Sequence, residues 1–301
     1  MVAKSRVTIR NSTRDRIFDI INYGALSLAT LTVIYPLYYI LIASITNPDL
    51  VAGGGIMVVP REVTFEGYRR ILAFSQLWVG YRNTIIYTVL GTLINLVLTL
   101  TAGYALSRKD FVGRNAFMVF LLVTMLFSGG MIPRYLLVRN LGMVNTRWAM
   151  LIPTAVGAWN LIVTRTFFQS TIPQDMLDAA VVDGCSNTRF FIHIVLPISP
   201  AIIAVMALFY GVGHWNTFFD ALIFIRARHL QPLQLVLREI LVQNQMDLEL
   251  LDDIQTMVDQ QRLVESLRYG IIFVASVPIL MLYPFLQKYF VKGVMIGAIK
   301  G

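Results

Sequence analysis

Apolar residues recur along the chain in six runs, each long enough to cross a membrane as a helix. An α-helix rises about 1.5 Å per residue and the hydrocarbon core is about 30 Å thick, so about 20 apolar residues make one span. The six runs are Ile17–Ile45, Asn83–Ser107, Ala116–Val138, Trp148–Phe168, Ile198–Phe219 and Tyr269–Phe290. They predict an all-α integral membrane protein with six transmembrane helices within residues 17–291. An even number of spans places both ends of the chain on one side of the membrane.

Two long intervals lie between spans on the side of the membrane opposite to the termini. Residues 46–82 begin as a glycine-containing loop, and the stretch EVTFEGYRRIL predicts a short surface helix. Residues 224–268 combine helical apolar spacing with five acidic residues, Asp247, Glu249, Asp252, Asp253 and Asp259. Loops of this length usually carry a function. Two interpretations of 224–268 stay open: an amphipathic cap at the membrane interface, or a docking surface for an extracytoplasmic protein.

The third apolar run is interrupted by the sequence SGGMIP at residues 128–133. Two glycines and a proline weaken or break the hydrogen-bond ladder of a helix. In lipid, a broken helix is tolerated where the freed backbone groups face protein or a water-filled cavity, so the interruption favours a transport pathway. The alternative is that the glycines let two helices pack closely.

A polar insertion, residues 173–197, separates the fourth and fifth runs. Pro173 suits the first position of a helix, and Gly184 suits the left-handed residue that ends one. Ser186 can cap a second helix, which Pro197 would end or kink. The pattern predicts two short helices joined at a glycine. Such a unit suits insertion into a groove of a partner, although an ordinary helix at the membrane interface has the same pattern.

Composition narrows the function. Charged residues make up 14% of the chain, against about a quarter in soluble domains, and the mean hydropathy is +0.67. The net charge of +8 does not indicate nucleic-acid binding, because Lys and Arg are scattered between the apolar runs. The single cysteine, Cys185, excludes an internal disulfide, and the three histidines are too far apart in sequence to predict a metal site.

The distribution of Lys and Arg gives the orientation only in part, since the totals on the two sides are nearly equal. The N-terminal tail, residues 1–16, holds five of them, and the short loop around Arg108, Lys109 and Arg114 holds three more. This density favours a cytoplasmic N-terminus. The first run is too long for the core of a cleaved signal peptide, so we expect it to be retained.

The polar insertion resembles the EAA motif of ATP-binding-cassette (ABC) importer permeases, EAA-x3-G-x9-I-x-LP, with aspartate in place of the usual glutamate. The resemblance implies the type I ABC importer permease fold and both termini in the cytoplasm. In that family the segment is a cytoplasmic coupling helix that docks in a cleft of the ATPase. The residues to which the resemblance gives a coupling role are Asp178, Ala179, Ala180, Asp183, Gly184, Ile194, Leu196 and Pro197.

The chain as a whole is similar to maltose-type carbohydrate permeases. SGGMIP and QPLQLVLREIL resemble the LplC/YtcP branch, and residues 292–301 resemble the cytoplasmic C-terminal extension of MalG-like subunits. The resemblance implies sugar uptake across a bacterial cytoplasmic (inner) membrane. The implied partners are a homologous second permease, two ABC ATPase subunits and an extracytoplasmic solute-binding protein. The chain has no Walker A pattern, so we expect a non-catalytic subunit without a cofactor, with ATP and Mg²⁺ bound by the ATPases.

Candidate residues of the translocation path or gate lie on the fourth and fifth runs: Asn160, His214, Trp215, Asn216 and Phe219. Aromatic rings stack on sugars and amides bond hydroxyls, but aromatic residues also gather at membrane interfaces. Arg134, Arg165 and His214 near span ends would favour an anionic oligosaccharide such as alginate or another uronate, although arginines there commonly reach out to headgroups.

An ATP-independent secondary transporter or channel is the alternative class. Such proteins usually place an ionisable residue inside the membrane, whereas the acids of the apolar runs, Asp19 and Asp220, lie near run ends. A membrane enzyme is the third possibility, and no nucleophile–base or metal constellation in the sequence supports it.

Overall fold

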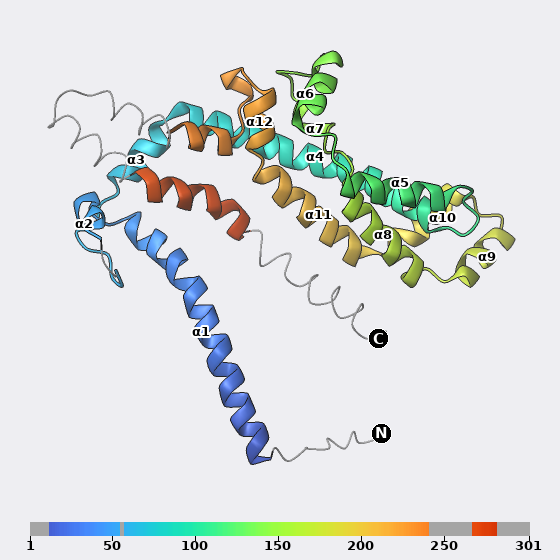
Figure 1. The fold of residues 1–301 in the computed structure, drawn as a ribbon, viewed down its shortest axis with the longest axis horizontal. Helices are drawn as coiled ribbons and strands as arrows, with labels where there is room; N and C mark the ends of the chain where they lie inside the picture. The colour runs from blue at the N-terminus through green and yellow to red at the C-terminus, as the bar shows by residue number, and fades with distance from the viewer. Residues whose placement is uncertain (1–11, 55–56, 241–266, 282–301) are drawn as a thin grey trace. The chain divides into compact units, whose positions relative to one another are not determined.

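The computed structural model describes residues 12–54, 57–240 and 267–281, and the regular elements in these ranges are helical (Figure 1). The chain divides into two compact units. One comprises Met1–Ile71 with Leu251–Phe273, and the other comprises Leu72–Leu250 with Val274–Gly301. Residues 1–11 of the N-terminal tail, the five acidic residues of the outer loop and residues 292–301 lie outside the described residues.

The first unit is built on α1, Thr13–Ala43, which matches the first predicted span. Ser12 caps it by accepting from the backbone of Arg14, and the Asp15 side chain accepts from the backbone of Ser12 in return. Only Ile42 and Ala43 of α1 are buried. A helix that is apolar all round and unburied in its own chain suits contact with lipid or with another membrane subunit.

Beyond α1 the same unit continues with α2, Pro48–Ala52, and α3, Glu66–Ala73. The Tyr68 hydroxyl on α3 donates to Oγ of Ser44 at 2.7 Å, which fixes α3 against the end of α1. The surface helix expected in EVTFEGYRRIL is therefore confirmed as α3.

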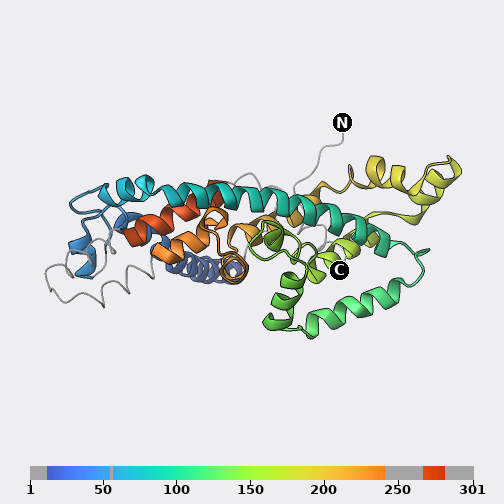
Figure 2. The ribbon, with the colours of Figure 1, turned by 90° about the horizontal axis from the view of Figure 1, so that it is seen from above.

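The second unit is organised along α4, Ser75–Ser107, which begins eight residues before the predicted Asn83. α8, Ala158–Thr171, and α11, Pro200–Trp215, pack along α4 (Figures 1 and 2). Glycines on α4 allow this close approach: a β-carbon at Gly91 would overlap the imidazole of His214, and one at Gly103 would lie 2.7 Å from the Thr164 methyl. Small residues at contacts let membrane helices approach closely.

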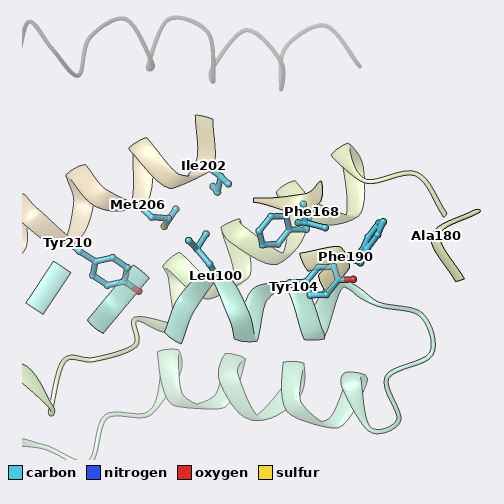
Figure 3. Close-up of a cluster of buried hydrophobic side chains, with 9 residues drawn as sticks. Leu100, Tyr104, Phe168, Ala180, Phe190, Ile202, Met206 and Tyr210 are labelled. Carbon is cyan, nitrogen blue, oxygen red and sulfur yellow. The ribbon is translucent and has the colours of Figure 1, made fainter. Parts of the chain in front are cut away.

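A hydrophobic core fills the space between these helices. It contains buried side chains of α4, α8, α10, α11 and the π-helix Phe191–Val195, together with Ala180 of α9 (Figure 3). The cluster comprises Leu100, Tyr104, Phe168, Ala180, Phe190, Val195, Ile202, Met206 and Tyr210. The core therefore reaches into the polar insertion and fixes it to the transmembrane helices.

The third predicted span, Ala116–Val138, is not one helix. It divides into α5, Arg114–Leu126, and α6, Met131–Asn140, which meet at an angle of 116°. Gly130 at the break has φ +81°, so the predicted interruption is confirmed. The alternative, glycines that let helices pack closely, finds no support within the described residues, because a β-carbon at Gly129 or Gly130 would meet nothing within 4 Å.

The fourth predicted span, Trp148–Phe168, also differs, because a short helix, α7, Trp148–Leu151, is separated from α8. Pro153 lies in the connection and lacks the N–H that a continuous helix needs. α8 has 14 residues, fewer than the roughly 20 that a straight span requires.

The fifth run, Ile198–Phe219, gives α11 and the start of α12, Phe219–Phe224. Of the sixth, Tyr269–Phe290, the structure describes the helix Leu267–Met281. In the described part of the chain, α1 and α4 are each long and apolar enough to span a membrane alone, and the number rises to four if each bent pair counts as one span.

The beginning of the 224–268 segment packs on the first half of α4. It contains the 3-10 helix η2, Arg228–Leu230, and helical residues 233–240. The Asn83 amide donates to the carbonyls of His229 and Gln231 at 2.8 and 3.0 Å, and the Leu233 N–H donates to Oγ1 of Thr84 at 2.8 Å. These contacts fix the entry to the segment at the end of α4 opposite to Ser107.

Candidate functional site

The polar insertion folds as the predicted pair of short helices. The first is α9, Gln174–Val182, which ends in a two-bond glycine cap. Gly184 has φ +73°, its N–H donates to the carbonyl of Val181, and the N–H of Cys185 donates to the carbonyl of Ala180 at 2.9 Å. These are the bonds of a Schellman motif, which favours glycine at the left-handed position. The cap gives the turn after α9 a defined conformation.

The second helix begins at Ser186, whose hydroxyl accepts from the Arg189 N–H at 3.3 Å. Four residues form α10, Asn187–Phe190, and the chain continues as a π-helix, Phe191–Val195. The following helix α11 is bent away from the α10 segment by 87°, as expected for a chain that passes Pro197. The predicted positions of the cap and of the kink are therefore confirmed.

The two faces of α9 differ in burial. Ala180 is 7% exposed and packs in the core with Phe190. On the outer surface, Val182 is 87% exposed and Val181 is 58% exposed. Ala179 is also exposed. The adjacent alanines of the motif thus have separate environments: Ala180 faces its own core, and Ala179 faces outward beside an apolar surface.

The other motif residues divide in the same way. Ile194 and Leu196 are partly buried against the core, whereas Pro197 is exposed. Asp178 is exposed and accepts a hydrogen bond from the Gln174 amide at 3.0 Å, one turn earlier on α9. Asp183 is exposed at the end of α9. The second helix therefore fixes the insertion to the core, and α9 presents its exposed residues to the outside.

Arg108, at the end of α4, joins α4 to the insertion. Its Nη1 donates to Oδ1 of Asn187 at 3.0 Å and to the Tyr104 hydroxyl at 3.1 Å. Nε and Nη2 donate to the two oxygens of Asp110 at 2.7 and 2.5 Å. These bonds raise the pKa of Arg108 and hold the pKa of the Asp110 carboxyl below its usual range. The side chain of Arg108 is only 13% exposed.

The Tyr104 ring extends this connection into the core. It stacks on Phe191 with the ring centres 5.0 Å apart and meets Phe168 edge-on at 6.1 Å. The sequence analysis used Arg108 only as one of the cations that indicate the orientation of the chain in the membrane. A possible signal was its position, directly after a long apolar run and four residues after a tyrosine, but the partner Asn187 is 79 residues away.

A cavity of about 460 Å³ lies on the other half of the same unit, between α6, α11 and the connection from α7 to α8. His214 is buried at its wall, where Nε2 donates to Oδ1 of Asn95 at 2.7 Å. The Asn95 amide donates in turn to the Thr154 carbonyl at 2.7 Å. Tyr210 lines the cavity as well, and its hydroxyl accepts from the Gly157 N–H at 3.1 Å. The cavity thus has a polar wall held in place by hydrogen bonds.

Of the five predicted path residues, only His214 lines this cavity. Trp215 is buried, and its indole N–H donates to the Ala275 carbonyl at 3.3 Å. Asn216 is exposed, and its side-chain amide donates a hydrogen bond to the Val212 carbonyl at 3.0 Å. Phe219 is 52% exposed. Asn160 is half-buried, and its amide lies beside Gly157, which lines the cavity.

The three basic residues grouped in the sequence, Arg134, Arg165 and His214, are separated in the structure. Arg134 lines the cavity and makes a bidentate ion pair with Asp220 at 3.0 and 2.9 Å. Arg165 lies elsewhere, because its Nε donates to the carbonyl of Leu106 near the end of α4. Arg134 and His214 therefore share a site, and Arg165 belongs to the end of the unit that holds the polar insertion.

Comparisons with known proteins identify the family, although no family model matches the chain. It is 36% identical over 294 residues to protein LplC of Bacillus subtilis, covering 98% of each chain. It is 34% identical over 291 residues to the B. subtilis polygalacturonan/rhamnogalacturonan transport system permease protein YtcP, covering 96% of this chain and 100% of the relative. The fold matches a bacterial ABC transporter involved in the import of the acidic polysaccharide alginate, with a TM-score of 0.81 and 31% identity over 94% of this chain and 100% of that one.

The chain therefore belongs to the permease subunits of ABC sugar-transport systems. It is an integral, non-catalytic membrane component of a binding-protein-dependent oligosaccharide importer. The expectation of an ATP-driven sugar permease is confirmed, and the alternative of an ATP-independent transporter or channel finds no support in these relatives.

Proposed function

We propose that α9 and α10 form the coupling segment of this permease and that the exposed surface of α9 docks in a cleft of an ATPase subunit. The observation that carries the proposal is the split of α9, with Ala180 fixed in the core while Val181 and Val182 remain exposed. Exposed apolar side chains on a short helix with a defined C-terminal cap suit insertion into a groove. Ala179, Asp178 and Asp183 on the exposed surface would complete the contact.

The proposal includes a topology and a set of partners. Six spans would cross the bacterial cytoplasmic membrane, with α5 and α6 together contributing one, and both termini would lie in the cytoplasm. A homologous second permease would supply the other half of the translocation path, and two ATPase subunits would bind ATP and Mg²⁺. An extracytoplasmic binding protein would deliver the sugar. The exposed apolar length of α1 supports contact with lipid or with the second permease.

Arg108 would transmit movement of the coupling segment to α4 as a positioning residue. We expect Arg108→Gln to lower the amount of sugar transported per ATP hydrolysed by about tenfold, because the links to Asn187 and Tyr104 are lost. Asp110→Asn removes the negative charge of the other partner of Arg108 and keeps these two links, so it should have a smaller effect. The measurement is paired uptake and ATPase activity in proteoliposomes. Unchanged coupling in Arg108→Gln would count against the assignment.

We further propose an acidic oligosaccharide as the substrate. Two relatives support this class: one is described as a permease for polygalacturonan and rhamnogalacturonan, and one belongs to an importer of the acidic polysaccharide alginate. Arg134 supplies a guanidinium at the cavity, 39% exposed and already paired with Asp220. A substrate carboxylate would accept hydrogen bonds from the Arg134 guanidinium, either beside Asp220 or in its place. A planar guanidinium suits this role because it binds carboxylates in bidentate geometry.

The test is uptake by the reconstituted transporter with its binding protein. We expect Arg134→Gln to reduce oligouronate uptake about tenfold, because a charge-assisted hydrogen bond contributes roughly 1.5–3 kcal/mol. Arg139→Gln is the matched control, since Arg139 is exposed on the same helix and does not line the cavity. Equal uptake by Arg134→Gln and the control would exclude Arg134 from substrate binding. Failure of the wild-type complex to take up any oligouronate would refute the substrate class.

A further inference from the structure

A second cavity, of about 450 Å³, lies where three apolar helices end beside the polar insertion. Ser107 at the end of α4, Arg114 at the start of α5, Ile172 after α8 and Leu177 on α9 all line it. These residues belong to one compact unit. The cavity shares no lining residue with the cavity that contains His214. The proposed transport and coupling roles leave it without a function.

The cavity is strongly basic. Arg108, Lys109 and Arg114 line it, and none of its lining residues carries a carboxylate. Arg108 is already paired with Asp110. The ion pairs among the described residues leave Lys109 and Arg114 without an acidic partner, and Nη1 of Arg114 makes only a long contact of 3.4 Å to the Arg108 carbonyl. Two cations are therefore available to an anion.

The start of α5 adds to this positive potential. Its N-cap is Gly113, with φ +83°, and no side chain caps the helix. The first N–H groups of an uncapped helix favour a negative charge. Arg114 is the first residue of the same helix, so the side-chain charge and the helix dipole act at one place.

The rest of the wall is apolar and includes Phe168, Ile172, Leu177 and Phe190. Contact with an apolar surface does not stabilise a bound soluble anion such as phosphate. It does stabilise the glycerol backbone and first methylenes of a bound phospholipid. The depth is also that of a lipid headgroup, because the ends of apolar spans lie at the membrane interface. Basic pockets between transmembrane helices at this level suit anionic headgroups.

We propose that this cavity binds the phosphate headgroup of an anionic phospholipid, with Lys109 and Arg114 on the phosphate and the apolar wall beside the start of the acyl chains. Because Leu177 and Gln174 of α9 line the same cavity, the bound lipid would contact the coupling segment from its membrane side and support its position. Placement in the cytoplasmic leaflet rests on the proposed function, whereas lipid binding itself does not.

The experiment uses the complete transporter complex in nanodiscs of phosphatidylcholine, with or without phosphatidylglycerol, and compares the wild type with Lys109→Gln/Arg114→Gln. Native mass spectrometry measures retained phosphatidylglycerol, and binding-protein-stimulated ATPase activity measures its effect. We expect retention by the wild type and roughly fivefold weaker binding for each cation removed. We also expect stimulation by phosphatidylglycerol in the wild type and its loss in the double variant. Arg139→Gln/Arg226→Gln is the control, since it removes two exposed cations outside the cavity.

A third arm adds inorganic phosphate to the complex in phosphatidylcholine alone. Stimulation by millimolar phosphate equal to that by phosphatidylglycerol would overturn the lipid assignment in favour of a soluble anion. Equal retention of phosphatidylglycerol by the double variant and the control would overturn the site. Lipid retention is measured without transport, so the two proposals can fail separately. If α9 proves not to couple ATP hydrolysis to uptake, but phosphatidylglycerol is still retained through Lys109 and Arg114, the coupling proposal is refuted and the lipid site stays supported.

Discussion

Val182→Asp should abolish sugar uptake while the protein still inserts and folds. Val182 is 87% exposed at the end of α9, so the substitution removes no packing within the chain. In the proposed complex the aspartate would be buried in the apolar part of the ATPase cleft, and burying an uncompensated polar group costs at least about 1–3 kcal/mol, with a charge costing more. We expect docking to weaken by 30-fold or more. The measurement is co-purification of the ATPase subunits together with uptake in proteoliposomes.

Val112→Asp is the matched control for this variant. Val112 is 91% exposed and lies in the loop between α4 and α5, outside α9. It should retain ATPase binding and uptake. If Val182→Asp transports as well as Val112→Asp, the exposed surface of α9 is not the docking surface, whatever the family resemblance implies.

Gly91→Val should destabilise the transmembrane unit by about 3 kcal/mol. A β-carbon at Gly91 would overlap the imidazole of His214, and this ring cannot turn away freely because it is buried and hydrogen-bonded to Asn95. Overpacking of this kind usually costs about 1–3 kcal/mol, with larger values where the neighbours cannot shift. Thermal unfolding of the detergent-solubilised protein measures the effect, together with the yield in the membrane.

The same substitution at Gly213 is the control, because a β-carbon there meets nothing within 4 Å of the described residues. Gly213→Val should leave the unfolding temperature nearly unchanged. The combination of Gly91→Val with His214→Ala should cost less than the sum of the two single changes, since the second removes the atoms that the first overlaps. Simple additivity would show that the destabilisation arises elsewhere.

Local patterns in the sequence predicted the elements whose causes are local. Hydropathy predicted α1 and α4, because a span depends only on a run of apolar side chains. Gly184 and Ser186 predicted the end of α9 and the start of α10, because a cap is made by a residue and its near neighbours. The break at Gly130 was predicted for the same reason.

Two features escaped prediction, one with a local cause and one that depends on distant partners. Hydropathy treated Trp148–Phe168 as continuous, because an apolar average overlooks the helix breakers Pro153 and Gly157, which lie between α7 and α8. It also grouped Arg165 with Arg134, whereas their partners, Leu106 and Asp220, lie in different parts of the unit. Long-range packing chose these partners, and a sequence pattern does not contain it.

The sequence by itself determined that this chain is an apolar helical membrane protein with a short, capped polar insertion in the pattern of ABC importer permeases. Only the tertiary structure decided which face of that insertion is free. Ala179 and Ala180 are adjacent and identical, yet Ala180 packs against Phe190 and Ala179 faces outward. The physical reason is that neighbouring residues of a helix point about 100° apart, and only the position of the core decides which of them is buried.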